Sequence, residues 1–166
     1  LAAKNSFAPM PASAVHTFCH AIPNRWYQMG VILAATDSLN WLARNLEVDA
    51  AELSNALGDR INGPNQMQFL PYLSGERTPH NDSAIRGALL SIDIASTRDD
   101  LTLAIMEGVS FALRDSLEAL KSTGTNLSRA LAIGGGSQSP YWVELIATVL
   151  DLPIDLSFVS APLSSK

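Results

Sequence analysis

The sequence predicts an α/β layer fold, and three observations carry that prediction. After residue 87 an apolar strand pattern is followed by a long amphipathic helix pattern, and residues 127–156 then give strand, glycine turn, helix and strand. The chain has 166 residues, of which 47% are hydrophobic and 16% charged. A single domain of this size buries roughly 70% of its unfolded surface, so one core is expected.

Composition also limits the function. The net charge of −5 argues against a nucleic-acid partner, because no basic patch is present to release counterions. The single Cys19 excludes an internal disulfide and fits a reducing compartment. No apolar run approaches about 18 residues and no signal-peptide pattern is present, so we expect a cytoplasmic protein without a membrane partner.

The first half is predicted to contain two strands and two helices. Residues 1–13, with two prolines and two serines, predict a loop or tail, and residues 15–22 predict a strand that closes in a Pro-Asn turn. Apolar residues at helical spacing predict a helix within residues 30–46 and a shorter one over residues 49–57. Residues 67–73 predict a short strand that runs into a polar loop.

His16, Cys19 and His20 raise the question of a metal site. On a strand the two histidines share a face but lie about 13 Å apart, and Cys19 points the other way. These side chains cannot close on one ion, so no metal site is predicted.

The polar loop of residues 74–83, SGERTPHNDS, lies between apolar elements. Loops in that position frequently carry function. The same composition is also common in ordinary turns, in which Glu76 and Arg77 would tie the loop to its neighbours. Both interpretations stay open.

Residues 87–94 predict a strand, and the clearest helix follows it. Thr97 with Asp100 three residues later marks its start, and Gly124 marks its end. Its apolar stripe lasts about six turns, or about 35 Å. Glu107 borders that stripe and is predicted to be a solvated or hydrogen-bonded flank, since charges avoid full burial.

The stretch of residues 134–139, Gly-Gly-Gly-Ser-Gln-Ser, is the candidate nucleotide site. It follows a strand at residues 130–133 and precedes a helix predicted for residues 140–151, with Ser139 as N-cap and a strand from Leu152. Glycines ahead of a helix N-terminus let a ligand approach free N–H groups, which favour anions such as phosphate. The alternative is a turn that carries glycine only because the chain bends.

Two nucleotide motifs can be tested here. A P-loop needs a lysine before Ser or Thr at the end of the turn, and none lies there. The Rossmann fingerprint fits better, because Gly134-x-Gly136-x-x-Ser139 lacks only the third glycine and Asp155 lies roughly 20 residues further on. Against it, Asp155 falls inside the apolar strand pattern, and Pro140 follows the place of the third glycine.

Four separated stretches resemble the FGGY family of carbohydrate kinases, and the likeness covers roughly residues 13–156. Motifs in the right order are more specific than any one alone, and within the family they are most similar to the D-xylulose-phosphorylating branch. The stretches are FCHAIPNRWYQMGVILAA at 18–35, FLPYLSGERTPHND at 69–82, DDLTLAIMEGVSFAL at 99–113 and IGGGSQSPYW at 133–142.

The resemblance implies an actin-like, ribonuclease-H-like fold and transfer of the γ-phosphoryl group of ATP, with Mg²⁺, to a sugar hydroxyl. D-xylulose is the expected sugar, with ribulose, gluconate, fuculose and glycerol as alternatives. Residues 1–166 would be the C-terminal, nucleotide-side domain, truncated at both ends. ATP or ADP would be its partner, and a homodimer is compatible with it. By position in the motif, the nucleotide-binding residues would be Gly134, Gly135, Gly136, Ser137 and Ser139.

The resemblance assigns no catalytic and no metal-binding residue to this chain. The family's Gly-Thr-Ser phosphate turn, its catalytic aspartate and most sugar contacts belong to parts that are absent, and a last helix is expected past residue 160. We therefore expect no kinase activity and only weak ATP binding from the chain alone. Ser91 stands where the family usually has glycine, and Gln138 where the xylulose branch frequently has a basic residue.

Two other classes remain as alternatives. One is a Rossmann-type oxidoreductase fragment, which would bind NAD in preference to ATP. The other is a non-catalytic association module, since a charge-poor, apolar composition suggests a surface that a partner covers.

Overall fold

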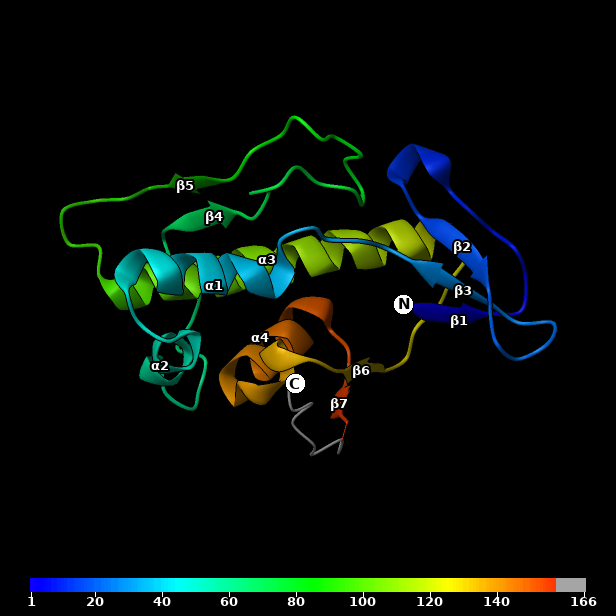
Figure 1. Cartoon of the computed structure of the whole chain (residues 1–166). Helices are drawn as coiled ribbons and strands as arrows, with labels where there is room; N and C mark the ends of the chain where they lie inside the picture. Colours follow the sequence, from blue (N-terminus) through cyan, green and yellow to red (C-terminus); the bar gives the residue numbers. More distant parts are fainter. Residues whose placement is uncertain (158–166) are drawn as a thin grey trace, which may run out of the picture.

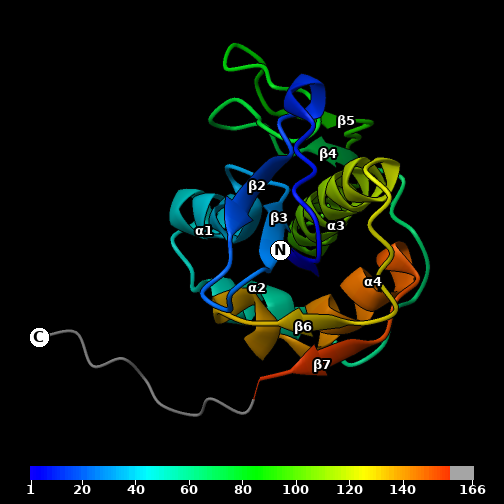
Figure 2. The ribbon, with the colours of Figure 1, turned by 90° about the vertical axis from the view of Figure 1, so that its right-hand side faces the viewer.

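The 25-residue helix α3 (Arg98–Ser122) is the central element of the structure, a computed structural model that describes residues 1–157. Figures 1 and 2 show α1 and α4 packed along it and the β4–β5 pair on another side. The predicted capping box is confirmed: Thr97 Oγ1 accepts the Asp100 N–H at 3.2 Å, and Asp100 Oδ2 accepts the Thr97 N–H at 2.8 Å. Such a cap satisfies two of the amides that a helix start leaves unpaired.

The strands form three small sheets in the described part of the chain. The first is antiparallel with the order β1–β3–β2, the second is the antiparallel pair β4–β5, and the third is the parallel pair β6–β7 joined through α4. The strands are β1 (Ala2–Lys4), β2 (His16–Cys19), β3 (Trp26–Met29), β4 (Gln68–Leu70), β5 (Ala88–Leu90), β6 (Ala130–Ala132) and β7 (Ile154–Leu156).

The prediction of a loop for residues 1–13 is wrong at Ala2–Lys4, which form β1, and Pro11–Ser13 form the short 3-10 helix η1. Residues 2–4 form a strand because they pair with β3, more than 20 residues further along the chain. Lys4 Nζ also donates to Thr123 O at 2.6 Å, at the C-terminal end of α3. A cation there is favoured by the helix dipole. This contact joins residues 119 positions apart, so no local pattern signals it.

The helix predicted within residues 30–46 begins later, as α1 (Ala35–Leu46), because residues 30–34 bond to distant side chains described below. Helix α2 (Ala50–Ala56) forms as predicted. The strands predicted at residues 87–94 and from Leu152 are confirmed only over β5 and β7. The last helix expected past residue 160 lies outside the described residues.

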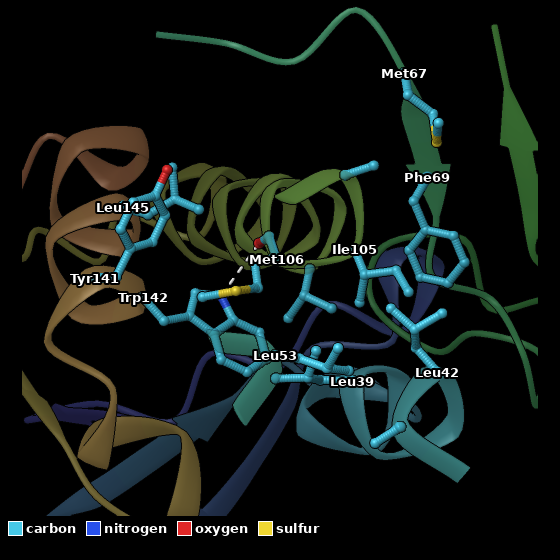
Figure 3. Packing of buried hydrophobic residues seen from close by; sticks show 13 residues of the cluster. Leu39, Leu42, Leu53, Met67, Phe69, Ile105, Met106, Tyr141, Trp142 and Leu145 are labelled. Carbon is cyan, nitrogen blue, oxygen red and sulfur yellow. Dashed lines mark hydrogen bonds between the residues drawn. The ribbon is translucent and has the colours of Figure 1, made fainter. Parts of the chain in front are cut away.

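The main core joins α1, α2, α3, β4 and α4 (Pro140–Leu150). Trp142 is 3% exposed, and its Nε1–H donates to Met106 O at 3.1 Å, the dashed line in Figure 3. This bond fixes the first turn of α4 on α3 and so positions the glycine turn that precedes it. The cluster contains Leu39, Leu42, Ala43, Leu53, Met67, Phe69, Ala104, Ile105, Met106, Val109, Tyr141, Trp142 and Leu145.

Candidate functional site

The glycine turn of residues 134–139 connects β6 to α4. Gly134 has φ 90° and ψ −176°, a backbone region that is essentially restricted to glycine. The short 3-10 helix η2 (Gly135–Gln138) follows, and Ser139 then caps α4, its Oγ accepting the Trp142 N–H at 3.3 Å. The N-cap predicted at Ser139 is therefore confirmed.

The amides of Gly135 and Gly136 distinguish this turn from an ordinary bend. They open η2, so neither has an acceptor within it, and within residues 1–157 neither donates to any other backbone group. Ser137 points inward instead, since its N–H and Oγ both donate to Gly134 O, at 3.2 and 2.7 Å. A Cβ placed on Gly135 would meet nothing within 4 Å. Two adjacent backbone donors without a backbone acceptor among the described residues can bind an anion.

The first turn of α1 faces the glycine turn. Thr36 Oγ1 and Cγ2 both lie 3.6 Å from the place where a Cβ on Gly136 would be. Helix α1 has no side-chain cap, because its N-cap residue is Ala34. Thr36 is not among the site residues predicted from the sequence, since it falls inside the longer helix predicted there, and no local signal brings it to the turn.

A cavity of about 640 Å³ opens beside the turn. Gly136 and Ser137 line it together with apolar residues of β1, α3, α4 and β6. It lies between the first sheet and β6, which have no strand pairing to each other in the described residues; Figure 2 shows β6 and β7 apart from β1, β2 and β3. The glycine turn therefore borders a largely apolar space on one side.

Asp155, the acid that the Rossmann alternative would assign to a ribose contact, is already in an ion pair. Asp155 Oδ1 accepts from Arg129 Nη2 at 2.7 Å, an ion pair between β7 and the residue before β6. Gln138 is exposed at the end of η2. The turn therefore carries no charged side chain, and its attraction for an anion comes from the backbone.

In the loop of residues 74–83, Glu76 is only 2% exposed, which is unusual for a carboxylate. Its Oε1 accepts the N–H groups of Leu33 at 3.1 Å and Arg77 at 2.7 Å, and among the described residues Oε2 has no partner. Burial raises the pKa of Glu76, outweighing these two amides and the nearby His80, which lower it. Glu76 thus ties the loop to its neighbours, while Arg77 is exposed.

Glu107 is also buried, more than the sequence predicts. It is 7% exposed, and its two oxygens accept the Asn65 N–H at 3.1 and 3.3 Å. Burial raises its pKa more than this bond lowers it. Of the two environments predicted for Glu107, solvated or hydrogen-bonded, the structure shows the hydrogen-bonded one.

Within residues 1–157, no three His, Cys, Asp or Glu side chains come together as a metal site. Cys19 is exposed, and His20 Nδ1 accepts the Ile22 N–H at 3.0 Å. The same part of the chain contains no helix that is long and apolar enough to cross a membrane.

Comparison with known proteins identifies the class. The family model described as FGGY family of carbohydrate kinases, C-terminal domain, matches residues 4–162. A xylulose kinase from Staphylococcus epidermidis is 38% identical over 144 residues, which cover 86% of this chain and 29% of the relative. The xylulose kinase of Escherichia coli is 36% identical over 155 residues, 93% of this chain and 32% of that enzyme.

Solved structures agree. A protein titled as a "xyloylose kinase" from Brucella ovis has 46% identity and a TM-score of 0.93, over 96% of this chain and 34% of its own. The xylulose kinase from Rhodospirillum rubrum has 28% identity and a TM-score of 0.81, over 93% and 31%. The fold is therefore that of the actin-like ATPases.

The chain belongs to the FGGY family of carbohydrate kinases and matches its C-terminal domain. It spans about a third of the length of the relatives it matches. Family membership excludes the Rossmann-type alternative.

Proposed function

We propose that the full-length protein containing this chain transfers the γ-phosphoryl group of ATP to a hydroxyl of D-xylulose, and that residues 1–166 form its C-terminal, nucleotide-side domain. Support comes from the family match and from four relatives whose names include xylulose kinase or a variant spelling of it. The open backbone at the glycine turn is the observation that carries the assignment of the nucleotide to this chain.

In this proposal the five residues of the turn have different roles in nucleotide binding. The amides of Gly135 and Gly136 bind phosphate oxygens, and Gly134 supplies the backbone conformation that aims them. Ser137 closes the turn onto Gly134 O, and Ser139 holds the helix start behind it. Phosphoryl transfer needs mainly positioning and charge stabilisation, so donors held by such bonds are suited to it.

The remaining chemistry is assigned outside this chain. A carboxylate that accepts the hydroxyl proton and most sugar contacts would come from the rest of the full-length protein. Mg²⁺ would be held chiefly by the ATP phosphates, as is usual for this ion, and no residue among the described ones is assigned to it. The exposed apolar residues Leu131 and Ile133 fit a surface that the rest of the protein covers.

Gly135→Ala in the full-length protein tests the nucleotide site. The added methyl group meets no protein atom. In the proposed complex the phosphate lies against the Gly135 backbone, so the methyl group would take part of the space that the phosphate needs. We expect the Kd for ATP to rise at least about tenfold while the melting temperature stays unchanged. Unchanged ATP affinity, measured by calorimetric titration, would remove the turn from the nucleotide site.

The acceptor is tested by comparing D-xylulose with ribulose, gluconate, fuculose and glycerol at equal concentrations. We expect the highest kcat/KM with D-xylulose. Residues 1–166 alone are expected to produce no ADP with any of them and to bind ATP more weakly than micromolar. Turnover by the isolated chain would contradict the division of the active site between two domains.

A further inference from the structure

The segment of residues 31–33, between β3 and α1, is held by side chains of the loop at residues 74–83. Thr78 and Val31 form a two-way pair: the Thr78 N–H donates to Val31 O at 3.0 Å, and Thr78 Oγ1 accepts the Val31 N–H at 2.9 Å. Glu76 Oε1 accepts the Leu33 N–H at 3.1 Å. The partners are 43 to 47 positions apart in the sequence. We call Glu76 and Thr78 the clamp.

The clamp is buried and anchored on its far side. Thr78 is 1% exposed, and its Oγ1 also donates to Ala14 O at 3.1 Å, while Glu76 pairs through its own backbone with Asp82. A Cβ on Gly30 would lie 3.4 Å from Thr78 Cγ2 and 3.1 Å from Ser116 Cβ. The start of the segment thus packs closely against α3 and the loop, so it has little freedom to shift.

The segment leads directly into the turn of α1 that faces the nucleotide turn. Thr36 follows Leu33 by three residues, and its side chain lies 3.6 Å from the Cβ position of Gly136. Helix α1 has no side-chain cap to fix its own start. The bonds from Glu76 and Thr78 therefore hold the chain immediately before α1, while the later turns of α1 are held by their packing in the main core.

We propose that Glu76 and Thr78 are positioning residues of the nucleotide site: through residues 31–36 they hold the first turn of α1 against Gly136. The inference rests on the proposed function, because it assigns the glycine turn to ATP. The proposal predicts that substitutions in the loop of residues 74–83 change the affinity for ATP although this loop does not contact ATP.

Thr78→Val in the full-length protein is the first test. Valine has the shape of threonine but leaves the Val31 N–H and Ala14 O without their partner. We expect the KM for ATP to rise about tenfold and the KM for the sugar to stay within about twofold, because a displacement of about 1 Å is enough for such losses. Thr78→Ser keeps the hydroxyl and is expected to restore the ATP value.

Thr102→Val is the matched control. Thr102 is 0% exposed, and its Oγ1 donates to Arg98 O at 2.9 Å within α3, away from residues 31–36. The Thr102→Val variant removes an equally buried hydroxyl by the same substitution, so its KM for ATP should stay at the wild-type value. Glu76→Ala, with Glu76→Gln keeping Oε1 as its rescue, provides a second route if Thr78→Val does not fold.

The outcomes separate the two proposals. If wild-type protein does not bind ATP, the proposed function fails, and amide hydrogen exchange at residues 38–40, the first hydrogen-bonded amides of α1, then tests the clamp by itself. Faster exchange in Thr78→Val than in Thr102→Val supports the clamp, and equal exchange overturns it. If wild-type protein binds ATP and both clamp variants keep its KM, the clamp is overturned while the proposed function stands.

Discussion

In the loop of residues 74–83, buried side chains accept hydrogen bonds from the backbone amides of residues 31 and 33. The turn of residues 134–139 differs, because within residues 1–157 the amides of Gly135 and Gly136 have no backbone acceptor. Glu76 and Thr78 are 2% and 1% exposed, but Gly134 and Gly135 lie open. Both regions are polar connections between apolar elements, but residues 74–83 contain one glycine and three charged residues, whereas residues 134–139 contain three glycines and no charge. Their difference lies in which groups are left over after the internal hydrogen bonds are made.

A structural loop and a binding loop differ in whether backbone hydrogen-bonding groups remain without a partner in the folded chain. A loop whose side chains satisfy the backbone of its neighbours stabilises the fold, because an unsatisfied buried group costs about 1–3 kcal/mol. A turn whose own amides remain unsatisfied has its hydrogen-bonding capacity available for a ligand. A polar composition alone does not distinguish these cases, because it does not show which amides find a partner in the folded chain.

The largest expected effect comes from the same substitution made in both regions. Gly75 has φ 79°, and a Cβ there would lie 2.9 Å from Ser83 Cα and from Ser83 O. Gly75→Ala should therefore lower the free energy of unfolding by about 3 kcal/mol through backbone strain and overpacking. Gly135→Ala should change it by less than about 0.5 kcal/mol, because the site is open. Urea unfolding of both variants measures the contrast.

Equal losses of stability in Gly75→Ala and Gly135→Ala would contradict this contrast, because the turn would then be packed like the loop. The double variant provides the internal control, since its loss of stability should match that of Gly75→Ala alone. The ATP affinities of folded protein should rank in the opposite order, with the larger loss in Gly135→Ala.

Much of the fold could be predicted from the sequence, and the rest depends on long-range bonds. The capping box at Thr97, the N-cap at Ser139 and the helix over residues 49–57 follow local rules, and all are confirmed. The start of α1 could not be predicted, because side chains more than 40 residues away hold residues 31–33 out of the helix. β1 was missed for the same reason, since its strand partner β3 lies more than 20 residues away in the sequence.

The candidate site also contains a part that local sequence patterns predict and a part that only the tertiary fold brings together. The glycine turn is visible in the sequence because a strand, three glycines and an N-cap are contiguous there. Thr36 is invisible, since only the tertiary fold brings the start of α1 to Gly136. The assignment of Gly134, Gly135, Gly136, Ser137 and Ser139 to the nucleotide stays a prediction.

Gly134→Ala should have an intermediate effect. An added Cβ meets nothing within 4 Å, so the cost is only the backbone strain of φ 90° and ψ −176°, about 2 kcal/mol. Because relief of that strain moves the amides of Gly135 and Gly136, ATP affinity should fall as well. Thermal melting and ATP titration of the same sample measure both. A variant with wild-type stability would show that the turn already adopts another conformation.

The buried carboxylate makes the loop sensitive to pH. Burial raises the pKa of Glu76 above its ordinary value of 4.5, so the folded state binds this proton more tightly than the unfolded state. Its contribution to stability is therefore fully present below about pH 4.5 and is lost as the pH rises through the folded-state pKa. Glu76→Gln removes this dependence, so its stability relative to wild type should increase as the pH rises above about 4.5 and through the folded-state pKa of Glu76.

Glu118 gives the control of opposite sign for this measurement. Hydrogen bonding from Lys121 lowers the pKa of Glu118, so its contribution is present at neutral pH and is lost as the pH falls through the folded-state value. Glu118→Gln should therefore be slightly less stable than wild type at neutral pH, and this difference in stability should disappear as the pH is lowered. Parallel pH profiles for wild type and Glu76→Gln would show that Glu76 is not shifted in the folded protein.

The smallest expected effect concerns Ser91, which has φ 61°. A left-handed conformation costs a residue with a Cβ about 1–2 kcal/mol, and glycine loses about 0.5–1 kcal/mol through its greater freedom in the unfolded chain. Ser91→Gly should thus stabilise the protein by about 0.5–1 kcal/mol, detectable as a higher urea midpoint with an unchanged m value. Asn81→Gly, at φ 49°, should gain less, because asparagine tolerates this region. If both substitutions gave equal gains in stability, the strain assigned to Ser91 would be wrong. If Ser91→Gly also changed the KM for ATP, Ser91 would affect nucleotide binding at the glycine turn as well as stability.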